Sequence, residues 1–485
     1  MEWLYLGRGT EEGIGTNHCT ERRIHPRRES LHDDVTARPT FFHLQNILLH
    51  QASCFSSSSL PSLLHSTAPS SSTMKWLGLL ALAGTALSHA HHDDAEVVPE
   101  HLRAELLKKW DQEFTFTGIA SFAHLKPIKC LVEPDERYDI AVIGAPFDTA
   151  VSYRPGARFG PRAIRAASAR QMAGTAYNTR AGINPYSSWA KVTDCGDIPI
   201  TPFDNALAER QMYEAFLELG SRAAVTPAEA AHGTKGISAG KAKLVTLGGD
   251  HSVALPALRA LYQIYGKPIT VLHFDAHLDT WNPVRYSAYW QSEQTHFNHG
   301  SFFHKASREG LICNATSAHA GLRTRLTGVD DSDYTNPGPE QGFLRIHADD
   351  IDELGGPVGI IDKIIDRIGL DPDQPVYLSV DIDVLDPATA PGTGTPEPGG
   401  WTTREFIRIL RGIEKLNIVG ADIVEVSPSY DNKGETTALA AAQVAFEIIT
   451  SMVKAGAGQD LGGWYGRKEA VAGEAPAEKE VKDEL

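Results

Sequence analysis

The chain of 485 residues is long enough for one large domain or two ordinary ones, and its 42% hydrophobic and 22% charged residues are typical of a folded soluble protein. A formal net charge of −16 argues against a nucleic-acid-binding protein, because such proteins need a basic surface. We assign most of the acidic excess to a solvated surface, and no internal repeat is visible.

Residues 1–73 show no sustained helical or strand period and end in a serine-rich run, which is typical of a disordered or non-native extension. Met74 then begins a stretch with one lysine, an apolar run and small residues at Ser88 and Ala90. This layout predicts a secretory signal peptide over residues 74–90, and its apolar run is short for a transmembrane helix. We therefore expect translation to begin at Met74. The alternative is a long disordered leader followed by an apolar helix.

The last four residues, Lys482 to Leu485, read KDEL and match an endoplasmic-reticulum retrieval signal. Together with the signal peptide they predict a protein of the ER lumen that has no membrane contact once the signal is cleaved. We expect the rest of residues 456–485 to be a flexible charged tail. Asn314 opens a glycosylation sequon, and the sequence leaves its use open.

Three cysteines follow Met74, namely Cys130, Cys195 and Cys313. Their number is odd and they lack the spacing of a CxxC motif. We therefore expect neither a disulfide framework nor a zinc site.

Between the two ends, runs rich in Val and Ile that are apolar on both faces alternate with helical patterns. This alternation predicts a three-layer α/β/α sandwich with a mainly parallel sheet. We expect one domain over residues 128–455, preceded by an N-terminal arm over residues 91–127. The predicted strands are 138–146, 243–250, 269–277, 343–350, 375–383 and 417–426. The predicted helices are 205–224 with Asn205 as N-cap, 402–416, and about 436–454.

Ionisable residues gather where three of these strands end, which is where ligands bind in open parallel sheets. They are His251 after the first, Asp275, His277 and Asp279 after the second, and Asp381 and Asp383 after the third. Each one alone has an ordinary explanation as a loop histidine or a helix cap. Four carboxylates this close would repel one another unless cations lay between them. Mixed carboxylate and imidazole ligands suit Mn²⁺, Fe²⁺ or Zn²⁺, and the excess of carboxylates favours two Mn²⁺ ions.

The segments GGDHS, FDAHLD and SVDIDVLDPATAPGTGTPEPGG resemble the three signatures of the ureohydrolase family, which includes arginases and agmatinases. The resemblance runs from about Tyr138 to Ser451, which makes residues 128–455 the catalytic domain. It implies an eight-stranded parallel sheet, two Mn²⁺ ions per chain and release of urea from a guanidino group. It also implies two ligand sets that share Asp275 and Asp381, one being His251, Asp275, Asp279 and Asp381, and the other Asp275, His277, Asp381 and Asp383.

The same resemblance implies the roles of the remaining residues. Two cations would acidify a shared water for attack on the guanidinium carbon, and Asp279 would orient that water. His299 matches the family's proton-shuttle histidine, which protonates the leaving amine. His296 is a rival, but the family pattern is a histidine followed by glycine. Glu425 matches the carboxylate that binds the guanidinium group, and its structural alternative is a surface ion pair.

The substrate is less clearly indicated. Residues 280–300 are long and aromatic and lack the arginase pattern for binding an α-amino acid, so we expect a ureohydrolase that is not an arginase. Agmatine, hydrolysed to putrescine and urea, is the first choice and 4-guanidinobutyrate is the rival. Arg285 could pair with the carboxylate of the rival, whereas an acidic contact such as Glu293 would suit agmatine. An arginase or a catalytically silent metal-binding scaffold is a weaker alternative.

Two further expectations concern structure and assembly. The arginines of residues 154–165 are expected to form structural ion pairs rather than to meet a substrate carboxylate, and His319 and Arg323 are expected to be structural. Family members form trimers or hexamers, which implies a homo-oligomer.

Overall fold

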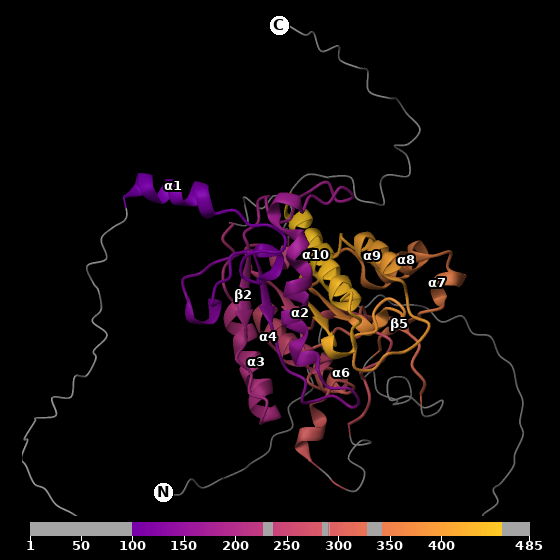
Figure 1. Cartoon of the computed structure of the whole chain (residues 1–485). Coiled ribbons are helices and arrows are strands. Elements are labelled where there is room, and N and C mark those ends of the chain that lie inside the picture. Colours follow the sequence, from indigo (N-terminus) through magenta and orange to yellow (C-terminus); the bar gives the residue numbers. More distant parts are fainter. Residues whose placement is uncertain (1–98, 227–235, 284–289, 291, 327–341, 458–485) are drawn as a thin grey trace, which may run out of the picture. The chain divides into compact units, whose positions relative to one another are not determined.

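The computed structural model describes residues 99–226, 236–283, 290, 292–326 and 342–457 (Figure 1). The predicted extension, signal peptide and KDEL, together with Arg285, lie outside the described residues, and the division into arm, domain and tail stays a prediction. The chain separates into two units, residues 22–112 and residues 1–21 with 113–485. Of the first unit the structure describes only residues 99–112, which contain helix α1 (Glu100–Trp110).

The second unit is built on one sheet of eight strands in the order β2-β1-β3-β8-β7-β4-β5-β6. Every pair of neighbouring strands is parallel, which confirms the predicted sheet. The strands are β1 (Ile140–Gly144), β2 (Val192–Asp197), β3 (Lys243–Leu247), β4 (Thr270–Phe274), β5 (Ala318–Leu322), β6 (Leu344–His347), β7 (Val376–Asp381) and β8 (Ile418–Val424).

Side chains on the two faces of the sheet belong to two separate hydrophobic clusters. On β1, Ile140 and Val142 join one cluster while Ala141 and Ile143 join the other, because successive strand residues point to opposite faces. The first cluster includes residues of α2, α8, α9 and α10, and the second includes residues of α3, α4 and α6. Helices therefore cover both faces, which confirms the three-layer sandwich (Figure 1). The helices of this unit are α2 (Gly160–Ala167), α3 (Asn205–Gly220), α4 (Ala254–Tyr265), α6 (Phe302–Arg308), α7 (Asp350–Glu353), α8 (Pro357–Ile368), α9 (Thr403–Gly412) and α10 (Thr436–Gly456).

Helix α10 is part of the core. By length and composition it could cross a membrane, but 83% of its most apolar window is buried inside the protein. A helix that is apolar on most of its circumference is typical of a position between other elements of a large domain. We therefore interpret its hydropathy as a consequence of packing against β8, α2 and α9.

The sequence patterns miss two strands, β2 and β5. β2 reads VTDCGD and carries polar and small residues, while β5 reads AHAGL and has no run of Val or Ile. Both are identified only by their pairing, β2 with β1 and β5 with β4 and β6. Strand formation here follows from neighbours in the sheet rather than from local preference.

The predicted N-cap of α3 is wrong by one residue. The carboxylate of Asp204 caps the helix and accepts a hydrogen bond from the backbone N–H of Leu207 at 3.0 Å. Asn205 is the first helical residue, and its side-chain oxygen accepts a hydrogen bond from the hydroxyl of Thr149 at 2.6 Å. Aspartate and asparagine are both favoured caps, so the pattern alone does not separate them.

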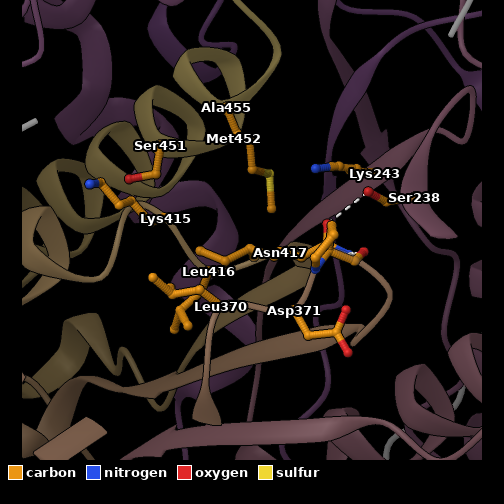
Figure 2. Close-up of a pocket in the computed structure, with 12 residues that line it drawn as sticks. Ser238, Lys243, Leu370, Asp371, Lys415, Leu416, Asn417, Ser451, Met452 and Ala455 are labelled. Carbon is orange, nitrogen blue, oxygen red and sulfur yellow. Dashed lines mark hydrogen bonds between the residues drawn. The ribbon is translucent and has the colours of Figure 1, made fainter. Parts of the chain in front are cut away.

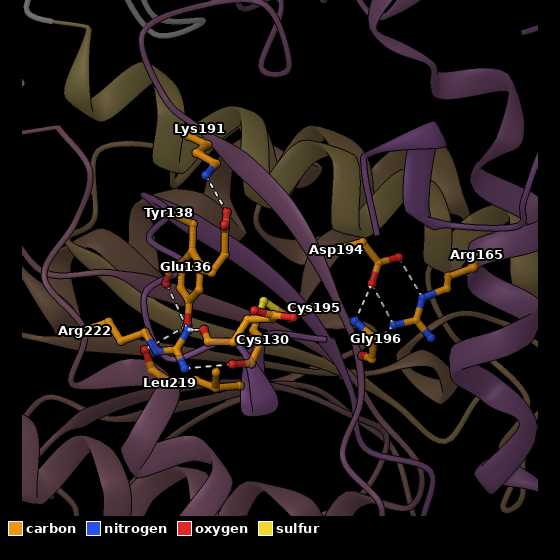
Figure 3. The surroundings of a disulfide bond; sticks show 11 residues. Cys130, Glu136, Tyr138, Arg165, Lys191, Asp194, Cys195, Gly196, Leu219 and Arg222 are labelled. Carbon is orange, nitrogen blue, oxygen red and sulfur yellow. Dashed lines mark hydrogen bonds and ion pairs between the residues drawn. A yellow bond between two sulfur atoms is a disulfide. The ribbon is translucent and has the colours of Figure 1, made fainter. Parts of the chain in front are cut away.

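Cys130 and Cys195 form a disulfide, which the expectation of no disulfide framework did not anticipate (Figure 3). Their Cα atoms lie 5.0 Å apart although 65 residues separate them along the chain. The bond ties the short turn Cys130–Val132 to the edge strand β2. An odd cysteine count without a motif concealed the pair, because only the fold brings the two residues together.

Arg165 of α2 is bound to the same edge strand, as Figure 3 also shows. Its Nε and Nη2 donate to the two carboxylate oxygens of Asp194 at 2.9 and 3.0 Å, and its Nη1 donates to Asp197 at 2.6 Å. A two-point contact between arginine and a carboxylate fixes both groups in orientation. For Arg165, the expected structural ion pair is confirmed.

We expect replacement of Cys130 and Cys195 together by alanine to lower the free energy of unfolding by roughly 2–4 kcal/mol, because the open chain gains entropy when the cross-link is lost. Urea unfolding followed by circular dichroism measures the change. Wild-type protein unfolded with an added reductant should also lose stability, by at least as much, because the reductant acts on the disulfide of Cys313 too. Equal stability of the variant and the oxidised wild type would contradict a structural role for this bond.

Candidate functional site

The four central strands of the sheet, β3, β8, β7 and β4, all end at one edge. Because the strands are parallel, their carboxyl ends and the residues that follow lie close together. His251 follows β3, Asp275, His277 and Asp279 follow β4, Asp381 ends β7 with Asp383 beyond it, and Glu425 follows β8. The structure thus brings together all six predicted metal ligands and the predicted guanidinium-binding residue.

The loop after β3 depends on a close approach of two backbone segments. A Cβ atom at Gly249 would lie 1.7 Å from the carbonyl oxygen of Phe147, so only glycine fits. Asp250 then fixes the loop, because its backbone N–H donates to the same carbonyl at 2.7 Å and its carboxylate accepts from the N–H of Ala150 at 3.1 Å. The next residue, His251, is held inside the protein with no exposed surface.

The ring of His251 is oriented by a hydroxyl on β7 and a carboxylate on β8. Its Nε2 lies 2.7 Å from Oγ of Ser379, and that hydroxyl donates its hydrogen to Asp422 at 2.9 Å. Since Ser379 has one hydroxyl hydrogen, it accepts from Nε2–H and leaves the lone pair of the neutral ring on Nδ1. A histidine held in this way presents Nδ1 as a metal ligand.

Three carboxylates meet at that nitrogen. Nδ1 of His251 lies 3.1 Å from Asp275 Oδ2, 3.0 Å from Asp279 Oδ2 and 3.3 Å from Asp381 Oδ2. His273, on β4, places its Nε2 3.0 Å from the same oxygen of Asp275. His251, His273, Asp275 and Asp279 together form a group that could hold one metal ion.

A second group uses the other oxygen of Asp275. Nδ1 of His277 lies 3.2 Å from Asp275 Oδ1 and 3.0 Å from Asp383 Oδ2, and these three residues could hold a second ion. Asp275 therefore faces both groups, as a bridging ligand must. Asp381 contacts the first group through Oδ2, while its Oδ1 accepts a hydrogen bond from the backbone N–H of Asp383 at 2.8 Å.

The buried carboxylates disfavour one another's charged forms. Burial, Asp383 and Asp275 raise the pKa of Asp381 well above 3.8, and burial and Asp275 raise the pKa values of Asp279 and Asp383. Burial lowers the pKa of His251, but its contacts with Asp275, Asp279 and Asp381 outweigh burial and raise it well above 6.5. The cluster therefore has a strong affinity for positive charge, whether protons or metal cations supply it.

His299 and Glu425 form a hydrogen-bonded pair beside this cluster. Nδ1 of His299 lies 3.1 Å from Oε1 of Glu425, which also accepts from the backbone N–H of His251 at 2.9 Å. On the other side of the ring, Nε2 accepts from the backbone N–H of Ser152 at 2.9 Å and lies 2.7 Å from its hydroxyl. In the neutral form of the ring, Nδ1 carries the proton and donates it to Glu425, because the backbone N–H at Nε2 can only donate.

The charge of Glu425 also sets the proton affinity of His299. Burial lowers the pKa of the imidazole, but Glu425, with Asp279 and Asp250, outweighs burial and raises it to about 9. His296, the rival for the proton-shuttle role, lies in the short turn Glu293–His296 and is not among the residues that line the cavity above the cluster.

Asp279 and Glu425 both adopt left-handed backbone conformations, with φ of +54° and +59°. Such conformations are costly for residues with a Cβ atom and persist where the surroundings enforce them. The carbonyl of Asp279 accepts from the N–H of Phe303 at 3.1 Å, and the N–H of Glu425 donates to the carbonyl of Gly249 at 2.8 Å. A strained backbone of this kind is typical of functional residues. Here it occurs at two of the three residues predicted to be catalytic.

A cavity of about 380 Å³ opens above the cluster. Asp279, His277, Asp381, His299 and Ser152 are among the residues that line it. Within the described part of the chain, no lysine or arginine lines it. The rest of the described lining is uncharged and includes Thr149, Asn205, Trp281, Thr295, Phe297 and Asn298.

The sequence patterns overlooked two residues that hold the site together. His273 lies in the apolar strand β4, and its Nδ1 is 2.7 Å from Nδ1 of His319, which makes His319 part of the support for Asp275. His273 lies two residues before Asp275, so both side chains point to the same face of the strand. This period of two could have identified His273 from the sequence. Ser152, which holds His299, lies in a loop and has no comparable pattern.

Arg323 has the structural role expected of it. Its guanidinium group donates to the carbonyl oxygens of Asp383 at 2.5 Å and Glu397 at 2.7 Å. It therefore fixes the backbone that carries one of the predicted metal ligands. Glu293, proposed as a contact for agmatine, is exposed and does not line the cavity, and Arg285 lies outside the described residues.

Comparison with known proteins agrees with this geometry. Residues 138–450 match the Arginase family. The chain belongs to the arginase family. It is 46% identical over 389 residues to "Putative agmatinase 1" of Schizosaccharomyces pombe, which covers 78% of this chain and 95% of that protein. It is 38% identical over 340 residues to an agmatinase of Chromobacterium violaceum, covering 70% of this chain and 90% of the relative.

Solved structures of arginase-family proteins share the fold. Proclavaminate amidino hydrolase from Streptomyces clavuligerus has a TM-score of 0.58 and 36% identity, covering 71% of this chain and all of that one. A hypothetical agmatinase from Burkholderia thailandensis has a TM-score of 0.57 and 33% identity, covering 70% and 93%. Membership of the arginase family confirms the resemblance to ureohydrolases and the prediction that the protein is an enzyme of this type.

We expect Asp275→Asn to weaken divalent-cation binding at least ~10-fold, because an amide cannot supply two anionic oxygens to two neighbouring groups. Calorimetric titration of the cation-free protein with Mn²⁺ measures the change. Asp204→Asn, which keeps a good helix cap away from the site, is the control and should bind as the wild type does. Unchanged binding in Asp275→Asn would rule out the proposed shared ligand.

We expect Glu425→Gln to lower the pKa of His299 from about 9, because it removes the carboxylate that most favours the charged ring and leaves burial acting against it. At pH 8 the imidazole of the variant should then be neutral in a larger share of molecules than in the wild type. Histidine NMR titration of the cation-free protein gives the pKa directly. A pKa that stays near 9 would show that Glu425 does not control this proton.

Proposed function

We propose that the protein is an agmatinase, a ureohydrolase that uses two Mn²⁺ ions to hydrolyse agmatine to putrescine and urea. The observation that carries this proposal is the double acidic cluster around Asp275, beside a cavity that is lined by His299, the partner of Glu425. The agmatinases among the most similar relatives support the choice of substrate.

The donor atoms fit two divalent cations. Nδ1 of His251, Oδ2 of Asp275 and Oδ2 of Asp383 are buried and make no hydrogen bond in the part of the chain that is described, although they lie 3.0–3.3 Å from other donors and acceptors of the cluster. Buried polar atoms without a hydrogen-bond partner are costly, and a cation bound between them would offset that cost. The oxygen-rich set with two imidazoles supports Mn²⁺.

We assign one Mn²⁺ to the site around His251 and the other to the site around His277, with Asp275 and Asp381 shared between them. His273, which contacts Asp275, is assigned a supporting role and not that of a ligand. When bound, the two cations supply Lewis acidity that lowers the pKa of a water and offsets the charge of the carboxylates. The ligand sets proposed are His251, Asp275, Asp279 and Asp381 for the first ion, and Asp275, His277, Asp381 and Asp383 for the second.

The protein's own side chains position the substrate and move its proton. Oε2 of Glu425 is buried without a hydrogen-bond partner, and in our proposal it accepts N–H groups of the guanidinium. Asp279 accepts a hydrogen bond from the attacking water and orients it. His299 supplies the proton that the leaving amine needs, and Ser152 holds the ring while Nε2 gains and loses that proton.

The uncharged lining of the cavity indicates which group the substrate carries at the end away from the guanidinium. A carboxylate such as that of 4-guanidinobutyrate needs a cationic partner, and the described lining contains no lysine or arginine. Aromatic and amide groups such as those of Trp281 and Asn298 can instead receive an ammonium group through the ring face and the amide oxygen. This lining favours agmatine, while Arg285 keeps 4-guanidinobutyrate as the second candidate.

The proposal is tested by measuring urea release from agmatine, 4-guanidinobutyrate and arginine in parallel, after loading the full chain with Mn²⁺. We expect kcat/KM for agmatine to exceed that for each of the other two at least ~10-fold, which corresponds to about 1.4 kcal/mol of transition-state binding. Faster hydrolysis of 4-guanidinobutyrate than of agmatine would identify 4-guanidinobutyrate as the preferred substrate. If no urea is released from any of the three compounds while Mn²⁺ is bound, the hydrolase activity is ruled out and the metal-binding scaffold becomes the favoured alternative.

We further propose that the protein works in the ER lumen as a homo-oligomer, a trimer or hexamer. The disulfide between Cys130 and Cys195 supports an oxidising compartment, because such bonds are rare where glutathione keeps thiols reduced. The predicted signal peptide and KDEL agree with it.

If this location is right, removal of Lys482–Leu485 should shift most of the protein from cell extracts into the culture medium, because the retrieval receptor no longer recognises it. Immunoblots of both fractions measure the shift. Replacing the same four residues by an unrelated tetrapeptide should have the same effect. Retention of the truncated protein in the cytosol would contradict entry into the secretory pathway.

A further inference from the structure

A second cavity, drawn in Figure 2, lies at the end of the sheet where the strands begin, whereas the acidic cluster lies where they end. Its volume is about 100 Å³, and it lies where β3 and β8 begin, beside the last turns of α10. We call it the Lys243 pocket. Its lining is Ser238, Lys243, Leu370, Asp371, Pro372, Lys415, Leu416, Asn417, Ile418, Ser451, Met452 and Ala455.

Lys243, the first residue of β3, is the unusual member of this lining. Only 6% of its surface is exposed, and its ammonium group makes no hydrogen bond or ion pair in the described part of the chain. Figure 2 shows the side chain directed into the pocket, toward Met452. Because so little of the side chain is exposed, its ammonium group is open to solvent only through the cavities that it lines.

The charge of Lys243 persists despite burial. Burial lowers the pKa of its ammonium group to about 8, so the charged form still predominates at pH 7. The carboxylate of Asp139, in an adjoining small cavity, accepts instead from the N–H groups of Thr226 and Lys191. Asp371 is exposed, and one of its oxygens accepts from the N–H of Asp373 at 2.9 Å.

The other polar groups of the pocket already have partners. The hydroxyl of Ser238 donates to Asn417 at 2.7 Å, the amide of Asn417 donates to the carbonyl of Pro372 at 2.8 Å, and the hydroxyl of Ser451 donates to the carbonyl of Glu447 at 3.0 Å. Lys243 is therefore the buried donor that remains for a ligand. Lys415, exposed at the rim, adds a second positive charge.

We propose that the Lys243 pocket binds a small oxyanion through the Lys243 ammonium group. A cavity of about 100 Å³ is large enough for waters or for one small anion. A small monocarboxylate fits best, because Leu416 and Met452 form an apolar wall for its carbon atoms while the carboxylate meets Lys243. Inorganic phosphate shares the same chemistry and is the other source of an oxyanion.

Thermal unfolding of the Mn²⁺-loaded full chain separates these ligands. At constant ionic strength, sodium acetate or sodium phosphate should raise the unfolding midpoint of the wild type over sodium chloride by roughly 1–3 °C at ten times the dissociation constant. A response to acetate alone identifies a carboxylate site, and a response to phosphate alone identifies a phosphate site. Lys243→Met fills similar volume without charge and should lose the response, whereas Lys415→Met should keep most of it.

The Lys243→Met comparison also subtracts any effect of the anions on the metal centre, which is unchanged in both proteins. An equal response of wild type and Lys243→Met, or no response of the wild type to either anion, would overturn the proposal. If Lys243→Met does not fold, wild-type crystals soaked in selenate provide an independent measurement. An anomalous selenium peak beside Nζ of Lys243 supports the site, and a pocket without one overturns it.

Discussion

The buried carboxylate of Asp275 is the group on which the rest of the site depends. Burial favours its neutral form, yet contacts with His273, His251 and His277 hold its pKa well below 3.8. Its two oxygens face different partners, Oδ2 toward His251 and Oδ1 toward His277. The negative charge of Asp275 therefore determines where cations or protons bind. Because the strands are parallel, the other carboxylates lie at the same end of the sheet.

Backbone contacts hold this arrangement against its own repulsion. The loop that follows β1 binds both halves of the site, since Ala150 donates to Asp250 and accepts from the N–H of His299. Glu425 binds the loop after β3 through its backbone and through its side chain, by way of Gly249 and His251. The pair His299–Glu425 and the acidic cluster thus belong to one hydrogen-bonded network, which explains how Asp279 and Glu425 keep left-handed conformations.

The sequence predicts the parts of the structure whose signal is local. A strand rich in Val and Ile that ends in several ionisable residues is distinctive, so β4 and β7 and the five predicted ligands at their ends are identifiable before any fold is known. Ser152, the disulfide between Cys130 and Cys195, and strand β5 depend on neighbours far along the chain. Their residues are individually ordinary, and only the packed sheet gives them partners.

Asp422 lies on β8, three residues before Glu425. Through Ser379 it sets the tautomer of His251, so a single strand orients a ligand of the metal centre and also carries the side chain proposed to hold the guanidinium group. A shift of β8 would therefore disturb both the orientation of His251 and the position of Glu425. The uncharged lining of the cavity belongs to other segments. Residues that line the cavity can therefore be exchanged without touching the strand that orients His251 and carries Glu425, so substrate preference and bond cleavage are separable in this fold.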